Sequence, residues 1–490
     1  MLIPRSALAL FALGVSVEAT IHVSNDTLSS GSPCACNKLL SRHPELTITQ
    51  DSDRYAFEST RFWDKRSNML PTCIFMPTSA DEVASAIGVF HKCDAQFAIR
   101  GGGHMNAMLV ALNNVDHLEL SSDGSSIHVG PGNTWNDVYS ALAPHGLYAI
   151  GGRLKTIGVP GLTLIGGVGY FLNKYGFSMD NVLSYDVVLG NGSRVRACKE
   201  SSPDLFWALK GGGSNYGIVT NFELKTYHVP KVSSTFQIFD EAHMQDFIAA
   251  ACDMAEWDDG AVGAGAVINM SYNTTTKKVT PQVFGLQEGV SSPPSRFANF
   301  TAIPAVQRMH NVTEPATWHS QFETPNQMFR IEFQHHTIKP DAKQLFKFYK
   351  IWRERVEDIL DVQGLLPTFV LNLVPKSAST VAKTNGIGNT FGLDDKESFI
   401  WYQLASSWAR EEDDLRMTTW ARTLMNQFHE MNKEDGLGTD FIYMGDAGED
   451  QTVFDHYKPG NIQKMRKIRD QYDPDLVFTR LNWGGFKLGY

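Results

Sequence analysis

Three glycine-rich clusters constrain the fold of this chain more than any other feature of its sequence. They are Arg100-Gly101-Gly102-Gly103-His104, residues 158–182 and residues 204–224. Glycine lets backbone N–H groups approach an anion closely, and successive N–H groups form an anion-binding nest. Tight turns alone would explain one cluster, but turns seldom need three consecutive glycines twice. The pattern therefore predicts loops that cradle a phosphate or a pyrophosphate.

The usual phosphate and catalytic signatures are missing. The sequence has no G-x-x-x-x-G-K-[ST], no complete G-x-G-x-x-G, no G-x-S-x-G and no H-E-x-x-H. A P-loop, a Rossmann fingerprint and a hydrolase elbow are therefore disfavoured. No cysteine pairs recur at zinc-site spacing, so we predict no metal site. The net charge of −10 over 490 residues disfavours a nucleic-acid partner, while 42% hydrophobic residues indicate ordinary globular domains.

The N-terminus is typical of a secretory signal. Arg5 precedes an apolar run over residues 7–17, and Val17-Glu18-Ala19 resembles a cleavage site, so we predict a signal peptide over residues 1–19. The alternative, a membrane anchor, needs a run of about 20 apolar residues. We expect a secreted protein or one of a secretory compartment. Six sequons could then carry N-glycans, at Asn25, Asn191, Asn269, Asn273, Asn299 and Asn311.

The cysteines support the same compartment. Four of the six precede residue 100 (Cys34, Cys36, Cys73 and Cys93), so we expect one or two disulfides that hold the N-terminal segment, with connectivity left open.

Local patterns indicate an α+β chain. The sequence predicts strands over residues 72–77 and 96–100, a helix over residues 79–93 capped by Ser79, and a hairpin over residues 184–198 around Asn191-Gly192. Later strands are expected over residues 328–338, 368–375 and 398–408, and an amphipathic helix over residues 341–360. His335 and His336 are adjacent in one such strand and should point to opposite faces. Trp401, Tyr402 and Gln403 occupy another, where core packing is the commoner reason for aromatic residues.

Five motifs occur in the order found in one flavoprotein family. They are FAIRGGGH (residues 97–104), residues 128–142, the loop over residues 158–182, residues 204–220 and residues 461–488. The chain resembles the vanillyl-alcohol oxidase/berberine-bridge-enzyme family, and within it secreted fungal FAD-linked oxidoreductases. The resemblance implies a lead-in over residues 20–65 and a PCMH-type FAD-binding domain of two α+β subdomains over residues 66–229. It further implies a substrate domain over residues 230–450, whose antiparallel sheet is covered by helices, and a segment over residues 451–490 that returns to the FAD domain.

The resemblance also implies the residues that contact FAD. Arg100, Gly101, Gly102 and Gly103 would wrap the pyrophosphate, and His104 would bond covalently to the flavin 8α-methyl carbon. Backbone contacts would come from Gly166, Gly167, Gly169, Gly217, Ile218 and Val219, and the C-terminal contacts from Tyr457 and Asn461. Many relatives form a second covalent link through a cysteine, but Leu154 occupies that position here. We therefore predict a single covalent attachment.

The candidate catalytic residues are Tyr443 and Asp446, in a predicted strand over residues 441–448. Relatives often carry Tyr-x-Asn-Tyr there, and Gly445 and Asp446 replace its Asn-Tyr pair. A partly buried carboxylate facing a flavin could take a proton from a substrate hydroxyl. The alternative is a solvated turn aspartate, since the sequence around Asp446 is also turn-like.

The resemblance implies a secreted oxidase. A base would remove a proton from an alcohol or a comparable C–H donor, hydride would pass to the flavin, and dioxygen would be reduced to hydrogen peroxide. The expected partners are dioxygen and a small organic molecule, such as a secondary metabolite or a sugar. Two alternatives stay open: a flavin-dependent cyclase, and a non-enzymatic glycoprotein that keeps the fold.

Overall fold

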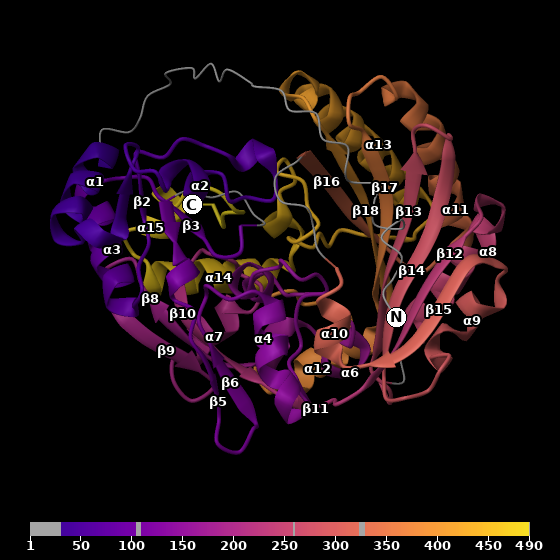
Figure 1. The fold of residues 1–490 in the computed structure, drawn as a ribbon, viewed down its shortest axis with the longest axis horizontal. Coiled ribbons are helices and arrows are strands. Elements are labelled where there is room, and N and C mark those ends of the chain that lie inside the picture. The colour runs from indigo at the N-terminus through magenta and orange to yellow at the C-terminus, as the bar shows by residue number, and fades with distance from the viewer. Residues whose placement is uncertain (1–30, 104–108, 258–259, 323–328, 490) are drawn as a thin grey trace.

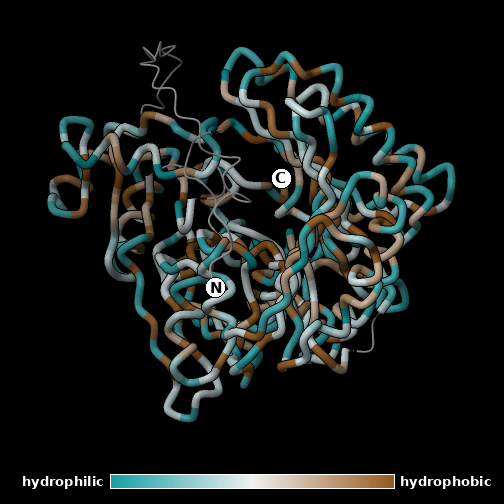
Figure 2. The backbone as a smooth tube through the Cα atoms, turned by 45° about the vertical axis from the view of Figure 1, so that its right-hand side comes forward, coloured by the Kyte–Doolittle hydropathy of each residue, from teal (hydrophilic) through white to brown (hydrophobic). Residues whose placement is uncertain are grey.

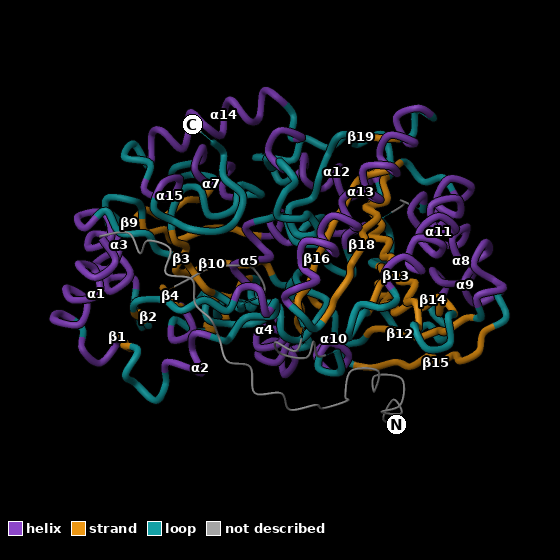
Figure 3. The backbone as a smooth tube through the Cα atoms, turned by 90° about the horizontal axis from the view of Figure 1, so that it is seen from above, coloured by secondary structure: helices purple, strands orange, loops and turns teal. Residues whose placement is uncertain are grey.

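The computed structural model describes residues 31–103, 109–257, 260–322 and 329–489. They form two halves, seen side by side in Figure 1: a half built from two small sheets, and a half built on one large sheet. The chain is α+β, as the sequence predicts. Figure 3 shows helices flanking strands in both halves. No described helix has the length and apolar character that crossing a membrane requires.

The first small sheet carries the first glycine cluster. Its strand order is β1 (Thr47–Thr49), β2 (Cys73–Phe75), β4 (Leu109–Ala111) and β3 (Ala98–Arg100). Helices α1 (Gly31–Arg42), α2 (Tyr55–Ser59) and α3 (Ala80–Cys93) accompany it. Helix α3 begins as predicted, because the Ser79 hydroxyl accepts a hydrogen bond from the N–H of Glu82. The predicted strands at residues 72–77 and 96–100 correspond to β2 and β3.

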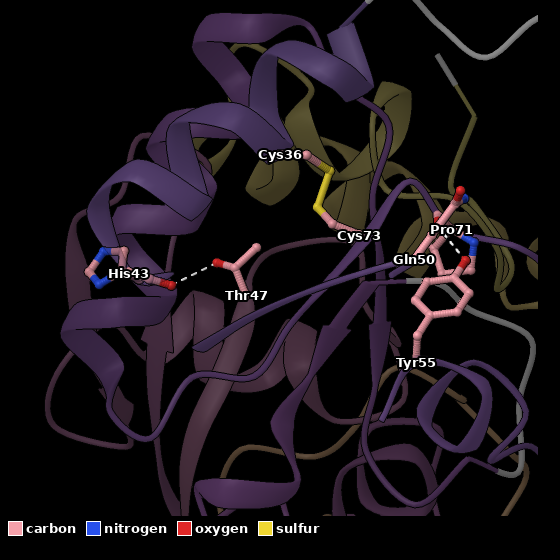
Figure 4. Close-up of a disulfide and its surroundings, with 7 residues drawn as sticks. All are labelled: Cys36, His43, Thr47, Gln50, Tyr55, Pro71 and Cys73. Atoms are coloured by element: carbon pink, nitrogen blue, oxygen red, sulfur yellow. Dashed lines mark hydrogen bonds between the residues drawn. A yellow bond between two sulfur atoms is a disulfide. The ribbon is translucent and has the colours of Figure 1, made fainter. Parts of the chain in front are cut away.

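Two disulfides hold the N-terminal helix against this sheet. Cys34 is bonded to Cys93 and Cys36 to Cys73, which confirms the expected disulfides in this segment. Figure 4 shows the Cys36–Cys73 bond between α1 and β2. Beside it the Thr47 hydroxyl donates a hydrogen bond of 2.8 Å to the carbonyl of His43. Because both disulfides involve α1, they join the lead-in covalently to the first subdomain.

The second small sheet holds the other two clusters. Its antiparallel strands follow the order β5 (Leu118–Leu120), β6 (Ser126–Val129), β10 (Ile218–Lys225), β8 (Val182–Val188) and β9 (Arg194–Cys198). Strands β8 and β9 form the predicted hairpin, and Gly192 at its turn has a φ of +82°. A two-stranded ribbon joins β7 (Leu147–Tyr148) to β11 (Tyr227–His228). The helices of this part are α4 (Trp135–Leu142), α5 (Val159–Leu164), α6 (Leu172–Tyr175) and α7 (Pro203–Leu209).

The large sheet has eight antiparallel strands. Their order is β15 (Ala305–Thr313), β12 (Val232–Phe239), β14 (Lys278–Glu288), β13 (Ala264–Asn273), β17 (Leu366–Val374), β18 (Phe399–Trp408), β16 (Arg330–Ile338) and β19 (Gly438–Thr439). Strands β16, β17 and β18 correspond to the three predicted over residues 328–408. Residue 328, the first of that prediction, lies outside the described residues.

Helices cover the outer face of the large sheet. They are α8 (Met244–Glu256), α9 (Ala298–Ala302), α11 (Ala342–Val356) and α13 (Asp414–Glu434). Helix α11 confirms the helix predicted over residues 341–360, although its last turn, residues 357–359, is a 3₁₀ helix. In Figure 2 hydrophilic and hydrophobic segments alternate along these outer helices, as amphipathic packing requires.

The inner face of the large sheet packs against the half with the glycine clusters. Neighbouring residues of β18 show the alternation: Tyr402 packs on Phe348 of α11, whereas Trp401 packs on Tyr443 and Phe177. The adjacent histidines of β16 also face opposite ways. His336 stacks on His429 of α13, and His335 lies edge-on to Trp401. Burial lowers the pKa of His335 to about 3, so its ring is neutral.

The C-terminal segment returns to the first half of the molecule. Helices α14 (Pro459–Tyr472) and α15 (Val477–Arg480) lie among the N-terminal elements in Figure 1. The remaining short helices are α10 (Pro315–His319), which contacts α4, and α12 (Lys376–Thr384), which contacts α6. The predicted strand over residues 441–448 is wrong. Those residues form a turn in which the N–H of Asp446 donates to the carbonyl of Tyr443, so they have no ladder partner.

Candidate functional site

The first and second glycine clusters meet backbone to backbone. A Cβ on Gly102 would lie 2.6 Å from both the Cα and the N of Gly158, and a Cβ on Gly101 would lie 2.5 Å from the Pro160 ring. Gly103 has a φ of +80°, which favours glycine. Gly161 differs, because a Cβ there would meet no atom within 4 Å. The two loops are therefore in contact, with open space beside them.

The side chain of Arg100 is occupied by another partner. Its guanidinium donates to the Glu58 carboxylate at 2.5 Å, to the Glu58 carbonyl and to the Asn113 side chain at 3.1 Å. Arg100 and Glu58 are both buried, so the pair neutralises two charges between α2 and β3. The Gly101–Gly103 backbone, rather than this guanidinium, is what the loop can offer to a phosphate. His104 lies outside the described residues.

Of the remaining predicted glycines, Gly166, Gly167 and Gly169 lie near the contact between the two halves, and Gly217 lies against the five-stranded sheet. Gly166 and Gly167 have φ values of +114° and +86°, and their carbonyls accept hydrogen bonds from Met179 and Ser178. A Cβ on Gly169 would lie 3.0 Å from the Gly151 carbonyl. Gly217 immediately precedes β10, in which Ile218 and Val219 are buried and paired with β8.

Two C-terminal residues connect these loops to the second half. The Tyr457 hydroxyl donates to the carbonyl of Gly211 at 3.2 Å, and its ring stacks on Phe441. The Asn461 amide donates to the carbonyl of Thr390 at 2.9 Å. Tyr457 therefore contacts the third glycine loop, Asn461 contacts the second half, and the roles of both toward FAD stay predictions.

Tyr443 touches the second glycine loop directly. Its buried hydroxyl accepts a hydrogen bond of 3.3 Å from the N–H of Gly167, and its ring stacks on Trp401 with centroids 4.5 Å apart. Burial raises the pKa of Tyr443, and the nearby Asp446 carboxylate adds to the rise. Its hydroxyl therefore stays protonated at neutral pH.

Asp446 is buried one turn after Tyr443, which excludes the solvated-turn interpretation. Its carboxylate accepts a 2.6 Å hydrogen bond from the Asn372 amide of β17. The oxygen of that amide accepts a 2.8 Å hydrogen bond from Arg153, which also donates to the carbonyl of Ala266. Burial raises the pKa of Asp446 to about 6, against the opposing effects of Arg153 and the Asn372 hydrogen bond.

Sequence reasoning missed Arg153 and Asn372. Arg153 directly precedes Leu154, between the motifs of residues 128–142 and 158–182, and Asn372 interrupts the apolar run of β17. A lone amide in a buried strand usually has a fixed hydrogen-bond partner, which was the available signal. A small cavity opens beside Arg153 between the halves, lined also by Gly169, Tyr170, Trp257 and Arg296.

Comparison with known proteins now identifies the fold and the chemistry. Residues 71–197 match a family model described as "FAD binding domain". The chain is 31% identical to the FAD-dependent monooxygenase prx3 of Penicillium roqueforti, over 97% of this chain and 98% of that protein. The chain belongs to the vanillyl-alcohol oxidase/berberine-bridge-enzyme family of FAD-linked oxidoreductases.

Further similarities agree with this assignment. The bifunctional solanapyrone synthase of Alternaria solani is 29% identical over 85% of this chain and 82% of that protein. Berberine bridge enzyme from Eschscholzia californica has the same fold, with a TM-score of 0.75 at 15% identity, covering 93% of this chain and all of that one. Xylooligosaccharide oxidase from Myceliophthora thermophila also has this fold, with a TM-score of 0.74 at 18% identity, covering 92% of this chain and 99% of that one.

The residues of this flavoprotein fit FAD. The backbones at Gly102 and Gly158 exclude side chains, and a Cβ at Gly161 would meet open space, as a loop that a diphosphate approaches closely requires. Tyr443, Tyr457 and Trp401 form a buried aromatic cluster beside the second and third glycine loops. The described residues contain no group of three or more His, Cys, Asp or Glu side chains that could hold a metal ion.

Proposed function

We propose that this FAD-linked oxidoreductase is a secreted oxidase that takes hydride from an alcohol, or a similar C–H donor, of a small organic molecule. The observation that carries the proposal is the buried Asp446 carboxylate, one turn from the Tyr443 hydroxyl that contacts the Gly167 loop. When bound, FAD accepts the hydride and passes the two electrons to dioxygen, which leaves as hydrogen peroxide.

In this proposal Asp446 is the general base. A base works best when its pKa lies near the working pH, and a pKa of about 6 leaves the carboxylate ionised at neutral pH yet more basic than an exposed aspartate. Asn372 orients the carboxylate through its amide N–H, and Arg153 fixes that amide by bonding its oxygen. Asp446 takes the hydroxyl proton as the substrate carbon loses hydride, and the alcohol becomes a carbonyl compound.

The test compares Asp446→Asn with Asp450→Asn, an exposed aspartate of the same turn region. With a substrate found by peroxide release, D446N should lower the anaerobic rate of flavin bleaching by about 100-fold or more, the usual effect of losing a general base. D450N should keep the wild-type rate. Equal rates for D446N and wild type would remove Asp446 as the base.

We further propose that His104 holds the flavin by one covalent bond. The support is the FAIRGGGH motif together with Leu154 at the position of the relatives' second link. Denatured wild-type protein should fluoresce on a gel as a flavin adduct, and His104→Ala should not. A dark wild-type band with a yellow native protein would mean that FAD is held without a covalent bond.

A second candidate retains the flavin but ends in a different product. The chain is similar to proteins named monooxygenase and synthase, and Gly445 and Asp446 replace the relatives' Asn-Tyr pair. Labelled dioxygen distinguishes these outcomes. An oxidase releases the label as peroxide, whereas a monooxygenase incorporates it into the product. A cyclase is recognised by a ring-closed product, and comparing the products formed with and without oxygen separates it from the other two.

We also propose N-glycans on the exposed sequons Asn191, Asn299 and Asn311, which follows from the secretory signal. Asn273 is half-buried and caps its own turn. Asn269 lies within β13 between two paired strands, and its side-chain oxygen is buried. We therefore expect no glycan on Asn269. Asn25 lies outside the described residues.

A further inference from the structure

The C-terminal strap, residues 482–489, contacts the start of β3 and the third glycine loop. The Trp483 N–H donates to the carbonyl of Phe97 at 2.6 Å, at the end of β3 opposite to Gly101–Gly103. The Asn482 amide donates to the Ser214 hydroxyl at 3.2 Å, directly after Gly211–Gly213. The strap therefore lies beside the third loop.

One residue of the strap, Lys487, is fixed from both sides by Asn215. The Asn215 amide nitrogen donates to the carbonyl of Phe486 at 3.1 Å, and its oxygen accepts from the N–H of Leu488 at 3.2 Å. A single side chain thus holds the backbone on either side of Lys487. The position of this lysine is set by the third glycine loop itself.

The ammonium nitrogen of Lys487 is buried and finds no hydrogen-bond partner in the described part of the chain. Burial lowers the pKa of Lys487 to about 8. Lys210, which precedes the same loop, differs because Asp180 lies near it and opposes the effect of burial on its pKa. A buried ammonium is unfavourable without a counter-charge, so the surroundings of Lys487 fit an anionic ligand.

We propose that Lys487 binds the diphosphate of FAD. The diphosphate carries the permanent negative charge of FAD, and a lysine ammonium binds phosphate as a point charge. The three glycine clusters contain three Lys or Arg residues, Arg100, Lys174 and Lys210. Arg100 is paired with Glu58, Lys174 is paired with Glu288, and Lys210 lies near Asp180. The strap supplies a positive charge that has no such partner.

The inference can be tested by binding, independently of catalysis. The full-length His104→Ala chain, freed of flavin, is titrated with FAD, ADP and riboflavin, in the presence and absence of K487M. Met keeps the length of the side chain without its charge. We expect K487M to weaken FAD and ADP on the order of tenfold or more, since each carries the diphosphate, and to leave riboflavin unchanged. K487R should retain part of the affinity.

A matched control is K464M, in α14 of the same C-terminal segment, where the ammonium lies 3.7 Å from the centre of the Trp207 ring. It should leave all three affinities unchanged. The melting temperature of the flavin-free K487M protein should equal or exceed that of its parent, because an unpaired buried charge is gone. K487Q provides a second uncharged variant in case methionine prevents folding.

Three results would overturn the inference. Unchanged ADP affinity in both uncharged variants would show that Lys487 does not contact the diphosphate. An equal loss of riboflavin and ADP affinity would place it at the flavin ring or assign it a general structural role. A lower melting temperature of the flavin-free variants, with a matching loss of all ligands, would make Lys487 a folding residue. None of these results depends on which substrate the oxidase uses.

Discussion

The side-chain amide of Asn372, in β17 of the large sheet, donates a 2.6 Å hydrogen bond to the carboxylate of Asp446, in the turn that follows Tyr443. Arg153, from the segment that precedes the second glycine cluster, donates to the oxygen of that amide. A residue from each half of the protein thereby controls one buried acid. The pKa of that acid is consequently a property of the docking of the two halves, and it can be altered from either side.

The first prediction concerns pH. If Asp446 is the base, kcat/KM rises about tenfold per pH unit below about pH 6 and levels above it, because the ionised form is active. The free energy of unfolding changes with pH in the opposite direction to the activity. The folded pKa exceeds that of an unfolded aspartate, so the folded protein binds the extra proton between about pH 4 and 6 and loses up to about 3 kcal/mol of stability as pH rises through this window. D446N should therefore melt at a higher temperature than wild type at pH 7, while being less active.

The second prediction tests whether Arg153 specifically lowers the pKa of Asp446. Arg153→Met removes a cation that lowers the pKa of Asp446, so the acid limb of the kcat/KM profile should move up by roughly one pH unit. Arg296→Met is the matched control, since Arg296 lines the same cavity but does not contribute to the pKa of Asp446. A profile that shifts equally in both variants would contradict a specific Arg153–Asn372–Asp446 relay.

Local signals predicted the local structure well. The cap at Ser79, the hairpin at Asn191-Gly192 and the opposite faces of His335 and His336 all follow from neighbouring residues, and each is confirmed. The prediction of the site residues depended on the family resemblance, because the contacts of the site join distant parts of the chain. Arg153 and Asn372 are separated by 219 residues, and nothing near either one shows the pairing. The wrong strand at residues 441–448 has the same origin, since an apolar run does not reveal whether a ladder partner exists.

The third prediction concerns the buried pair of Arg100 and Glu58. Glu58→Gln leaves a buried guanidinium without its counter-charge, and should cost about 3–5 kcal/mol of unfolding free energy. Asp81→Asn, which breaks the exposed pair with Arg194, should change it by less than about 1 kcal/mol. Denaturant unfolding measures both. Similar small losses would mean that the Arg100 charge is balanced elsewhere.

The fourth prediction concerns the disulfide between Cys36 and Cys73. Replacing both residues with serine opens a loop whose ends are 37 residues apart, which should cost roughly 4 kcal/mol in the chain-entropy view. Cys198→Ser, at a free cysteine, should have little effect by comparison. Unfolding free energies give the comparison directly. The flavin content of the variant should fall less than its stability, because neither cysteine belongs to the glycine loops.

The fifth prediction distinguishes a glycine that lets the first two glycine loops touch, Gly102, from a glycine that leaves space beside them, Gly161. Gly102→Ala places a methyl group 2.6 Å from the Gly158 backbone, so the loops must separate, and both the melting temperature and the flavin content should fall. Gly161→Ala meets no protein atom within 4 Å, so the flavin-free protein should remain as stable as wild type. If the open space there is where the diphosphate approaches, FAD affinity should still drop. Gly88→Ala, in α3 and also without neighbours within 4 Å, should raise stability by up to about 1 kcal/mol and leave flavin binding unchanged. Wild-type FAD affinity in G161A would place the diphosphate elsewhere along the contact between the loops.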